Sequence, residues 1–266
     1  MTGQQLEFVR VEDRGRVRIV TIDRPEVMNA LHPPAQVEMS RVFDDFARNE
    51  ESWIAILTGA GDKAFSAGND LKFQARHGAA AVSSGRLGAR GGFGGITSRN
   101  DLYKPVIAAV NGFALGGGFE MALACDILVA AENARFGLPE PRVGLLAAAG
   151  GVHRLPRQLP YHVAMGMLLT GRQVDAQEAF RIGLVNEVVP QAELLDAALR
   201  WADQILEGAP LSIRATKECV VRGLELDLDQ ALDAFFPGQR AMAASEDFVE
   251  GPKAFAEKRK PNWKGR

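Results

Sequence analysis

Cysteine and histidine are scarce in this sequence, which has two cysteines and four histidines among its 266 residues. Cys125 and Cys219 lie far apart, so they suggest no disulfide framework, and no spacing of Cys and His matches a zinc site. We therefore expect neither a metal nor a disulfide. Neither is needed for folding, because a chain of this length buries roughly 70–75% of the surface that it exposes when unfolded.

Long apolar runs and a surplus of one charge are also missing. No run of about 18 uninterrupted apolar residues occurs, so no membrane span is predicted, and residues 1–14 lack the apolar centre of a signal peptide. The formal net charge of −2 argues against general attraction to nucleic acid or to an anionic membrane. We expect a soluble, cytoplasmic protein that has neither nucleic acid nor a membrane as a partner.

The patterns that are present alternate between strand and helix. Short apolar runs that predict strands occupy residues 16–23, 53–57, 105–110 and 126–131. Helical spacing follows Pro33-Pro34 between the first two runs, and Gly116-Gly117-Gly118 begins a helix between the last two. A strand, a helix and a strand in close succession predict a βαβ unit with parallel strands.

From about residue 192 the pattern becomes purely helical. Amphipathic spacing predicts four helices, over residues 196–206, 212–224, 228–243 and 247–258. We therefore predict an α/β core over residues 1–195 and a helical C-terminal region over residues 196–266.

One stretch, residues 74–100, matches neither pattern. It is rich in small residues, and its glycines include Gly85, Gly88, Gly91, Gly92, Gly94 and Gly95. A loop of this length in a compact domain is commonly functional or disordered. Two interpretations stay open, a flexible insertion and a mobile wall of a binding site.

Two glycine-bearing turns, residues 64–71 and 111–120, carry a chemical signal. In the second, Gly116-Gly117-Gly118 lies between a strand and a helix, where the first N–H groups of the helix have no internal partner. Such a terminus favours negative charge, including that of a developing oxyanion. The alternative is a tight turn that needs positive φ.

Two glutamates follow these turns. Glu120 lies in the first turn of the predicted helix, and Glu140 lies in a segment with Gly137 and Pro139, outside any predicted helix. Paired carboxylates can share general acid and general base work on one water molecule. The alternative is that each is an ordinary acid at a helix start or in solvent.

These segments closely resemble those of a known family. Residues 64–71, 105–126, 136–151 and 169–189 are similar to the signature segments of the enoyl-CoA hydratases in the crotonase superfamily. Arg24-Pro25 and Asn29-Ala30-Leu31 resemble the family's first turn that contacts coenzyme A. The similar segments follow in the family's order from about residue 15 to the C-terminus, and on them the chain is identified as a member of this superfamily.

The resemblance implies a fold and an activity. The fold is the crotonase spiral of ββα units, with C-terminal helices that make contacts in a homotrimer or in a homohexamer of two trimers. The activity is the reversible syn addition of water to a 2-enoyl-CoA thioester. No metal or redox cofactor is implied, because coenzyme A enters as part of the acyl-CoA substrate.

The resemblance also implies roles for individual residues. The N–H groups of Ala67 and Gly117 form an oxyanion hole for the thioester carbonyl, and Glu120 and Glu140 hold and activate the water. The groove for coenzyme A is lined by Glu26, Val27, Met28, Ala67, Gly68, Asn69, Asp70, Leu71, Gly116 and Gly117. The chemistry agrees, since hydration puts negative charge on the thioester oxygen, which two N–H donors stabilise.

The sequence departs from the family pattern in residues 144–151, which contain no carboxylate and no proline. Dienoyl-CoA isomerases and aryl dehalogenases of the superfamily carry an essential Asp near Ala148, so this alanine argues against both activities. The presence of both glutamates argues against isomerases that use one. The run of small residues is expected to widen the acyl pocket, which leaves the natural substrate open.

The C-terminal tail, from residue 245 onward, resembles that of carnitinyl-CoA dehydratase, and so does the stretch around Phe93. Dehydration of a carnitinyl thioester is therefore the alternative to general enoyl-CoA hydration. The tail is basic, and Lys258 and Lys260 are expected to bind the phosphates of coenzyme A. The competing interpretation is a solvated charged tail.

A non-catalytic or RNA-binding protein of the same fold is the rival from another class. The presence of both glutamates speaks against a catalytically dead protein. An RNA-binding protein would need a basic helix, whereas residues 38–51 mix Arg41 and Arg48 with five acidic residues.

Overall fold

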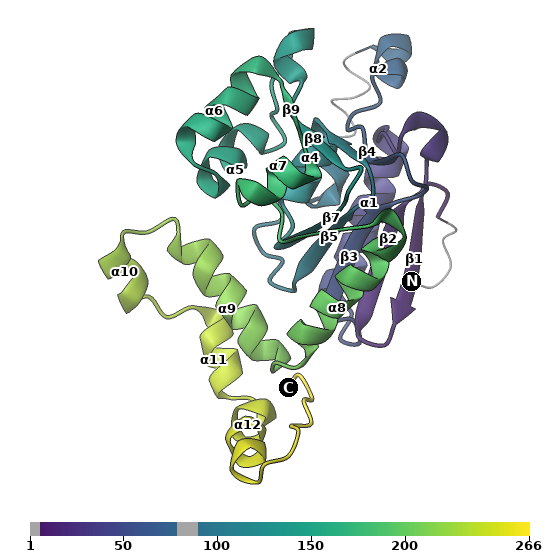
Figure 1. The fold of residues 1–266 in the computed structure, drawn as a ribbon. Helices are drawn as coiled ribbons and strands as arrows, with labels where there is room; N and C mark the ends of the chain where they lie inside the picture. Colours follow the sequence, from purple (N-terminus) through teal and green to yellow (C-terminus); the bar gives the residue numbers. More distant parts are fainter. Residues whose placement is uncertain (1–5, 79–89) are drawn as a thin grey trace. The chain divides into compact units, whose positions relative to one another are not determined.

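The computed structural model describes residues 6–78 and 90–266. The chain forms two compact units, one made of residues up to 99 together with 106–199, and the other made of residues 100–105 together with 200–266 (Figure 1). The first unit contains both sheets, and the second is helical. The predicted role of residues 196–266 in oligomerisation stays a prediction.

A six-stranded sheet forms the centre of the first unit, in the order β1-β2-β3-β5-β7-β10. Its strands are β1 (Val9–Arg14), β2 (Val17–Ile22), β3 (Ile54–Gly59), β5 (Val106–Val110), β7 (Ile127–Ala131) and β10 (Glu187–Val189). The β1 strand pairs antiparallel with β2, and the other pairings are parallel. The inner strands are almost wholly buried, which explains why they are continuous apolar runs in the sequence.

A second sheet has four short strands in the order β4-β6-β8-β9. They are β4 (Ala64–Ser66), β6 (Phe113–Leu115), β8 (Arg135–Gly137) and β9 (Gln173–Asp175). The strands β3, β5 and β7 of the large sheet are each followed in the chain by β4, β6 and β8 of the small one. This repeated succession of two strands and a helical segment is the predicted ββα spiral, and the predicted fold class is confirmed.

The first unit carries its helices between these strands. They are α1 (Pro33–Arg48), α2 (Leu71–His77), α4 (Gly117–Leu123), α5 (Gly151–Gln158), α6 (Tyr161–Thr170), α7 (Ala176–Arg181) and the start of α8 (Leu194–Leu206), with short 3-10 turns at η1 (Pro25–Val27), η2 (Phe93–Gly95), η3 (Glu140–Val143) and η4 (Gln191–Glu193). The predicted start of α1 at the two prolines is confirmed. Proline suits this position because the N–H groups of the first helical turn have no partner inside the helix, so the N–H that proline lacks is not missed. The α1 helix buries Met39, Val42, Phe43 and Phe46 along one face.

The second unit consists of α9 (Pro210–Gly223), α10 (Leu228–Asp233), α11 (Pro237–Ala243) and α12 (Glu246–Ala256), after the end of α8. The prediction of one helix over residues 228–243 is wrong. Ala234, just after α10, and Phe236, just before α11, have extended backbones with ψ of 138° and 157°. Pro237 disfavours helical geometry at the residue before it and then begins α11, so amphipathic spacing continued across a break.

Two structural findings bear on the kind of protein. Across the two described stretches, no helix is both long and apolar enough to cross a membrane. Within the same residues, no group of three His, Cys, Asp or Glu side chains is arranged to hold a metal ion.

Candidate active site

The two glycine-bearing turns are in direct contact in the first unit. A Cβ on Gly118 would lie 2.0 Å from Ser66 O, so only glycine lets the first turn of α4 approach the end of β4 this closely. A Cβ on Gly68 would lie 2.7 Å from the nitrogen of Gly117. The glycines of both turns therefore let the Gly117 N–H lie directly beside the turn after β4.

The N–H groups of the turn after β4 are mostly paired inside the fold. The bonds run from Ala67 N to Met28 O (2.9 Å), from Gly68 N to Ser66 Oγ (3.1 Å) and from Asp70 N to Leu31 O (3.1 Å). Among the described residues, the N–H of Asn69 has no hydrogen-bond partner, and neither has the N–H of Gly117 at the start of α4. These two N–H groups remain able to bind an anion.

This pairing corrects one prediction. Ala67 is expected from the resemblance to donate to the thioester oxygen, but its N–H already donates to Met28 O. The unpaired N–H of the turn belongs to Asn69, which the sequence assigns only to the groove for coenzyme A. No feature of the sequence distinguishes the two, because the pairing of Ala67 depends on the distant turn at residues 25–28.

Glu120 is held by the next helix. Its side chain is 3% exposed, and its Oε1 accepts a hydrogen bond from the Gly151 N–H at 2.8 Å. Gly151 is the first residue of α5, and the positive end of that helix favours the charged form of the carboxylate. Sequence reasoning missed Gly151, although the Gly150-Gly151 pair before a helix was a signal for a close approach.

Glu140 lies beside Gly116 of the glycine turn, in a different environment. Its Oε1 lies 3.0 Å from where a Cβ on Gly116 would be. Its Oε2 is buried and has no hydrogen-bond partner among the described residues. Burial raises the pKa of Glu140 to about 7, its own backbone N–H opposes the rise, and the charge of Glu120 adds to it. Glu140 therefore keeps its proton to a higher pH than an ordinary glutamate does.

The residues predicted for the groove come together around η1. Asn29 holds this turn, since its Nδ2 donates to Ala64 O at 2.7 Å, and Arg24 pairs with Asp70 at 3.2 Å. Residues 26–28 therefore lie beside residues 67–70. Leu71, at the start of α2, is 49% exposed, so it presents an apolar side chain to solvent at the end of this surface.

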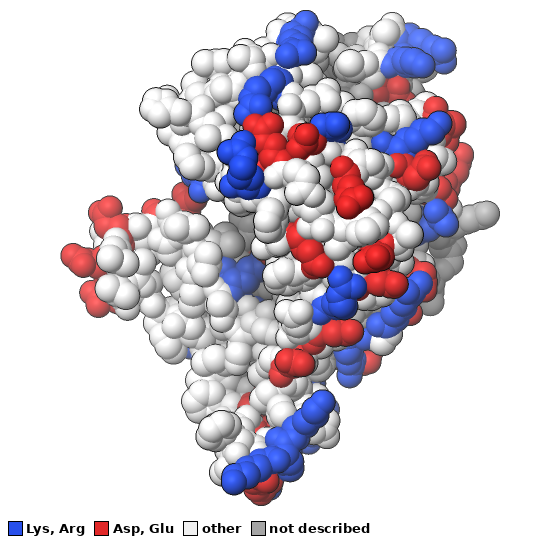
Figure 2. Space-filling view, in the orientation of Figure 1, with Lys and Arg blue, Asp and Glu red and all other residues white. Residues whose placement is uncertain are grey.

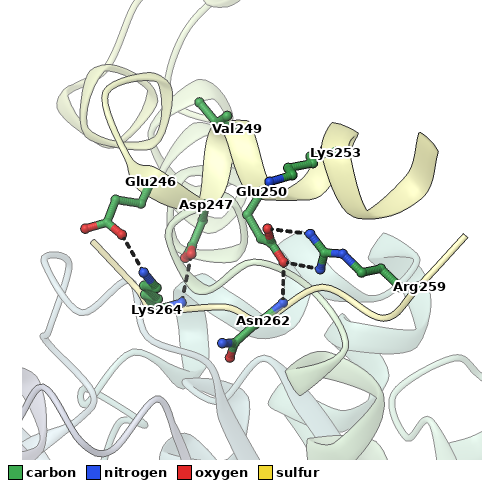
Figure 3. A pocket seen from close by; sticks show the side chains of 8 residues that line it. All are labelled: Glu246, Asp247, Val249, Glu250, Lys253, Arg259, Asn262 and Lys264. Atoms are coloured by element: carbon green, nitrogen blue, oxygen red, sulfur yellow. Dashed lines mark hydrogen bonds and ion pairs between the residues drawn. The ribbon is translucent and has the colours of Figure 1, made fainter. Parts of the chain in front are cut away.

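Lys258 and Lys260 belong to the second unit, whereas the other predicted site residues belong to the first. Both are exposed and follow α12, in a tail that folds back along this helix (Figure 3). Asp247 accepts hydrogen bonds from the N–H groups of Lys264 and Gly265, each at 2.8 Å. Arg259 pairs with Glu250 at 2.6 Å. The tail is therefore fixed by its neighbours, while contact of the two lysines with coenzyme A stays a prediction.

Comparison with known proteins gives the family. The family model for "Enoyl-CoA hydratase/isomerase" matches residues 12–266. Carnitinyl-CoA dehydratase from Citrobacter koseri is 46% identical, over 99% of this chain and 100% of the relative. Its counterpart from Escherichia coli (strain K12) is 46% identical, over 98% of this chain and 99% of the relative.

Solved structures of the same class superpose on the chain. An enoyl-CoA hydratase from Bacillus anthracis has a TM-score of 0.91 and 35% identity, over 98% of this chain and 100% of that one. An enoyl-CoA hydratase from Mycobacterium tuberculosis H37Rv has a TM-score of 0.89 and 38% identity, over 97% of this chain and 99% of that one. The chain belongs to the enoyl-CoA hydratase/isomerase family, within the crotonase superfamily.

Proposed function

We propose that the protein is a hydro-lyase that adds water reversibly to a 2-enoyl-CoA thioester. The observation that carries the proposal is the arrangement around the glycine turn. The two glycine-bearing turns touch there and carry two unpaired N–H groups among the described residues, while Glu140 lies beside Gly116 with a pKa raised to about 7, in part by the charge of Glu120. The family and the similar hydratases and dehydratases support the same reaction class.

The N–H groups of Asn69 and Gly117 act as the oxyanion hole. When water adds to C3 of the enoyl group, negative charge moves to the thioester oxygen as an enolate. Two fixed donors stabilise that charge more than they stabilise the ground-state carbonyl, and loss of one such donor costs about 100-fold to 1,000-fold in rate. Support comes from the close approach of Gly68, the residue before Asn69, to the Gly117 nitrogen, and from the absence of competing partners for both N–H groups among the described residues.

The glutamates divide the proton transfers. Glu120, kept charged by Gly151 and the start of α5, removes a proton from the water as its oxygen bonds to C3. Glu140, protonated through burial, delivers a proton to C2 as the enolate collapses. One hydroxyl group and one proton are thus added to the thioester. The proton that Glu120 took up then passes to Glu140, directly or through solvent, which restores both groups, and the reverse steps dehydrate a 3-hydroxyacyl thioester.

A carnitinyl thioester is the finer proposal for the substrate. Its support is the 46% identity to carnitinyl-CoA dehydratases over almost the whole of both chains. A panel of crotonyl, longer enoyl, branched and crotonobetainyl thioesters would decide it. A kcat/KM for crotonobetainyl-CoA at least tenfold above the others would support the carnitinyl substrate, and a preference for simple enoyl chains would overturn it.

The remaining parts of the proposal concern partners and setting. Coenzyme A lies along residues 26–28 and 67–71 as part of the substrate, and water addition requires no redox cofactor because no electrons are transferred. Charges of both signs are interspersed on the face in Figure 2, which supports the absence of a nucleic acid partner.

Three leucines of the second unit are largely exposed: Leu224, Leu228 and Leu232 are 81%, 73% and 74% exposed, which supports a homotrimer or homohexamer. The protein acts in the cytoplasm.

Mass spectrometry of the product tests the reaction most simply. Crotonyl-CoA incubated with the protein should gain one water, and the loss of the enoyl absorbance should follow the protein concentration. An RNA gel shift at moderate salt, run in parallel, tests the rival class. No mass gain on any enoyl thioester, together with RNA binding, would reject the hydro-lyase.

A further inference from the structure

The described end of the glycine-rich stretch, residues 90–99, is closely packed and has no role in the site as proposed. Gly91, Gly92, Gly94 and Gly95 all have positive φ, of 90, 73, 58 and 67. Phe93, between them, is 6% exposed. Four glycines with positive φ within five residues give the backbone a conformation that is strained for any residue with a side chain. That conformation brings Phe93 to a defined position.

One side of this segment is tied to α1 by Arg99. The guanidinium is 2% exposed and pairs with Asp44 at 2.8 Å. It also donates to Gly95 O at 2.5 Å and to Ser40 O at 2.9 Å. All three nitrogens are thus engaged, so the segment cannot shift relative to α1 without breaking a buried charge-assisted network.

The other side of the segment rests on α4. A Cβ on Gly117 would lie 2.6 to 3.0 Å from three atoms of the Phe93 ring, and a Cβ on Gly94 would lie 2.1 Å from the Met121 sulfur. Gly117 and Met121 are four residues apart, so they lie on one face of α4. The segment is therefore a wedge between α1 and the helix that carries Gly117 and Glu120.

We propose that Phe93 is a positioning residue that fixes the Gly117 N–H in the oxyanion hole. The inference rests on the proposed function, which makes that N–H a donor. Gly117 has no side chain with which to anchor itself, so the Phe93 ring supplies the packing atoms on the side where a Cβ would be. An oxyanion donor needs such support, because a displacement of about 1 Å can cost on the order of 100-fold in rate.

Substitution of Phe93 tests this directly. Phe93→Ala should lower kcat about 10-fold to 100-fold, and the KM for the acyl-CoA should change less than about threefold, because the lost contact matters most in the transition state. Phe93→Leu should recover a large part of kcat. Phe46→Ala, at a buried phenylalanine of α1 outside the wedge, is the matched control for destabilisation and should keep its kcat per folded molecule.

A spectroscopic reading separates positioning from general damage. A 3-ketoacyl thioester bound in the site ionises to an enolate, which absorbs in the ultraviolet and needs the same N–H donors. In Phe93→Ala the pH at which half of the bound ligand is enolate should rise by about 1 unit, which is a tenfold loss of preference for the anion. The Phe46→Ala control should show the wild-type midpoint.

A double substitution tests the contact itself. Gly117→Ala keeps the N–H but forces a methyl group into the Phe93 ring, so it should be costly in the wild type and much less costly in Phe93→Ala. Additive effects, or an unchanged enolate midpoint in Phe93→Ala, would overturn the inference. If the wild type neither hydrates enoyl thioesters nor favours the enolate, the proposed function fails instead.

Discussion

The two glutamates of the site share a chemical group but not an environment. Glu120 accepts an N–H bond from the start of α5, whereas the buried oxygen of Glu140 has no partner within the described residues. The first arrangement stabilises a charged carboxylate, and the second disfavours it. Water addition needs one group of each kind, so the difference between the two environments is as important as the presence of two acids.

The raised pKa of Glu140 predicts a cost in stability. The carboxyl group of Glu140 has a pKa of about 7 in the folded chain, whereas in the unfolded chain it ionises near its ordinary pKa of 4.5. The unfolded chain therefore binds fewer protons in this window, and wild-type stability should fall as pH rises from about 4.5 to about 7.

Glu140→Gln removes this titration. The stability of this variant relative to wild type should increase as pH rises through that window and stay constant above it. Denaturant unfolding at pH 5, 6, 7 and 8 measures the difference. Glu132→Gln, at an exposed glutamate, is the control and should track wild type. If the difference in stability between Glu140→Gln and wild type does not change with pH, the pKa of Glu140 is the same in the folded and unfolded chains, which would contradict the raised pKa.

Ala67 and Asn69 mark the limit of prediction at this scale. The motif of residues 64–71 identifies the turn, and its glycine predicts a close approach, which Gly68 makes to Gly117. Which N–H is left unpaired depends on Met28 and Leu31, whose positions follow from the packing of the whole unit. Sequence reasoning therefore located the turn but assigned the donor role to Ala67, whose N–H is already paired with Met28 O.

At the scale of elements, apolar periodicity predicted the buried strands and α1, because each buries a continuous face. The short strands β4, β6, β8 and β9 have three residues each, too few for a period to be recognised. The break between α10 and α11 was missed for the opposite reason, since the spacing continued across it. Of the glycine-rich stretch, residues 79–89 lie outside the described residues.

The wedge of residues 90–99 predicts a contrast between two arginines that pair with the same acid. Arg99→Ala removes the closer ion-pair partner of Asp44 and the side-chain donor to Gly95 O, which should cost roughly 3 kcal/mol of unfolding free energy. Arg90 also approaches Asp44, at 3.9 Å, but its side chain is 60% exposed. Arg90→Ala should cost less than about 1 kcal/mol. Equal costs in urea unfolding would contradict a buried anchor.

At the scale of the whole molecule, the basic tail of the second unit carries an untested prediction, which is contact with coenzyme A. If Lys258 and Lys260 bind the phosphates of coenzyme A, changing both to Ala should raise KM about fivefold to tenfold at low salt while kcat changes little. The effect should shrink as salt is raised.

A truncated thioester without the nucleotide is the control for this tail prediction. It should have the same KM with both proteins, because it has no phosphates for the two lysines to bind. If both substrates suffer equally, or if only the assembly seen on a sizing column changes, the tail acts in packing and the charge argument is wrong.

The central claim is that two glutamates with unlike protonation hydrate an enoyl thioester, and one set of kinetic measurements tests it most directly. The kcat/KM for crotonyl-CoA hydration should be measured from pH 5 to 9 for wild type, Glu120→Gln, Glu140→Gln and the exposed control Glu132→Gln. Each site variant should lose about 100-fold to 10,000-fold, the control should match wild type, and wild-type activity should decline above pH about 7 as Glu140 ionises. Near-normal turnover by either site variant, or a wild-type rate that rises through pH 7, would contradict the account.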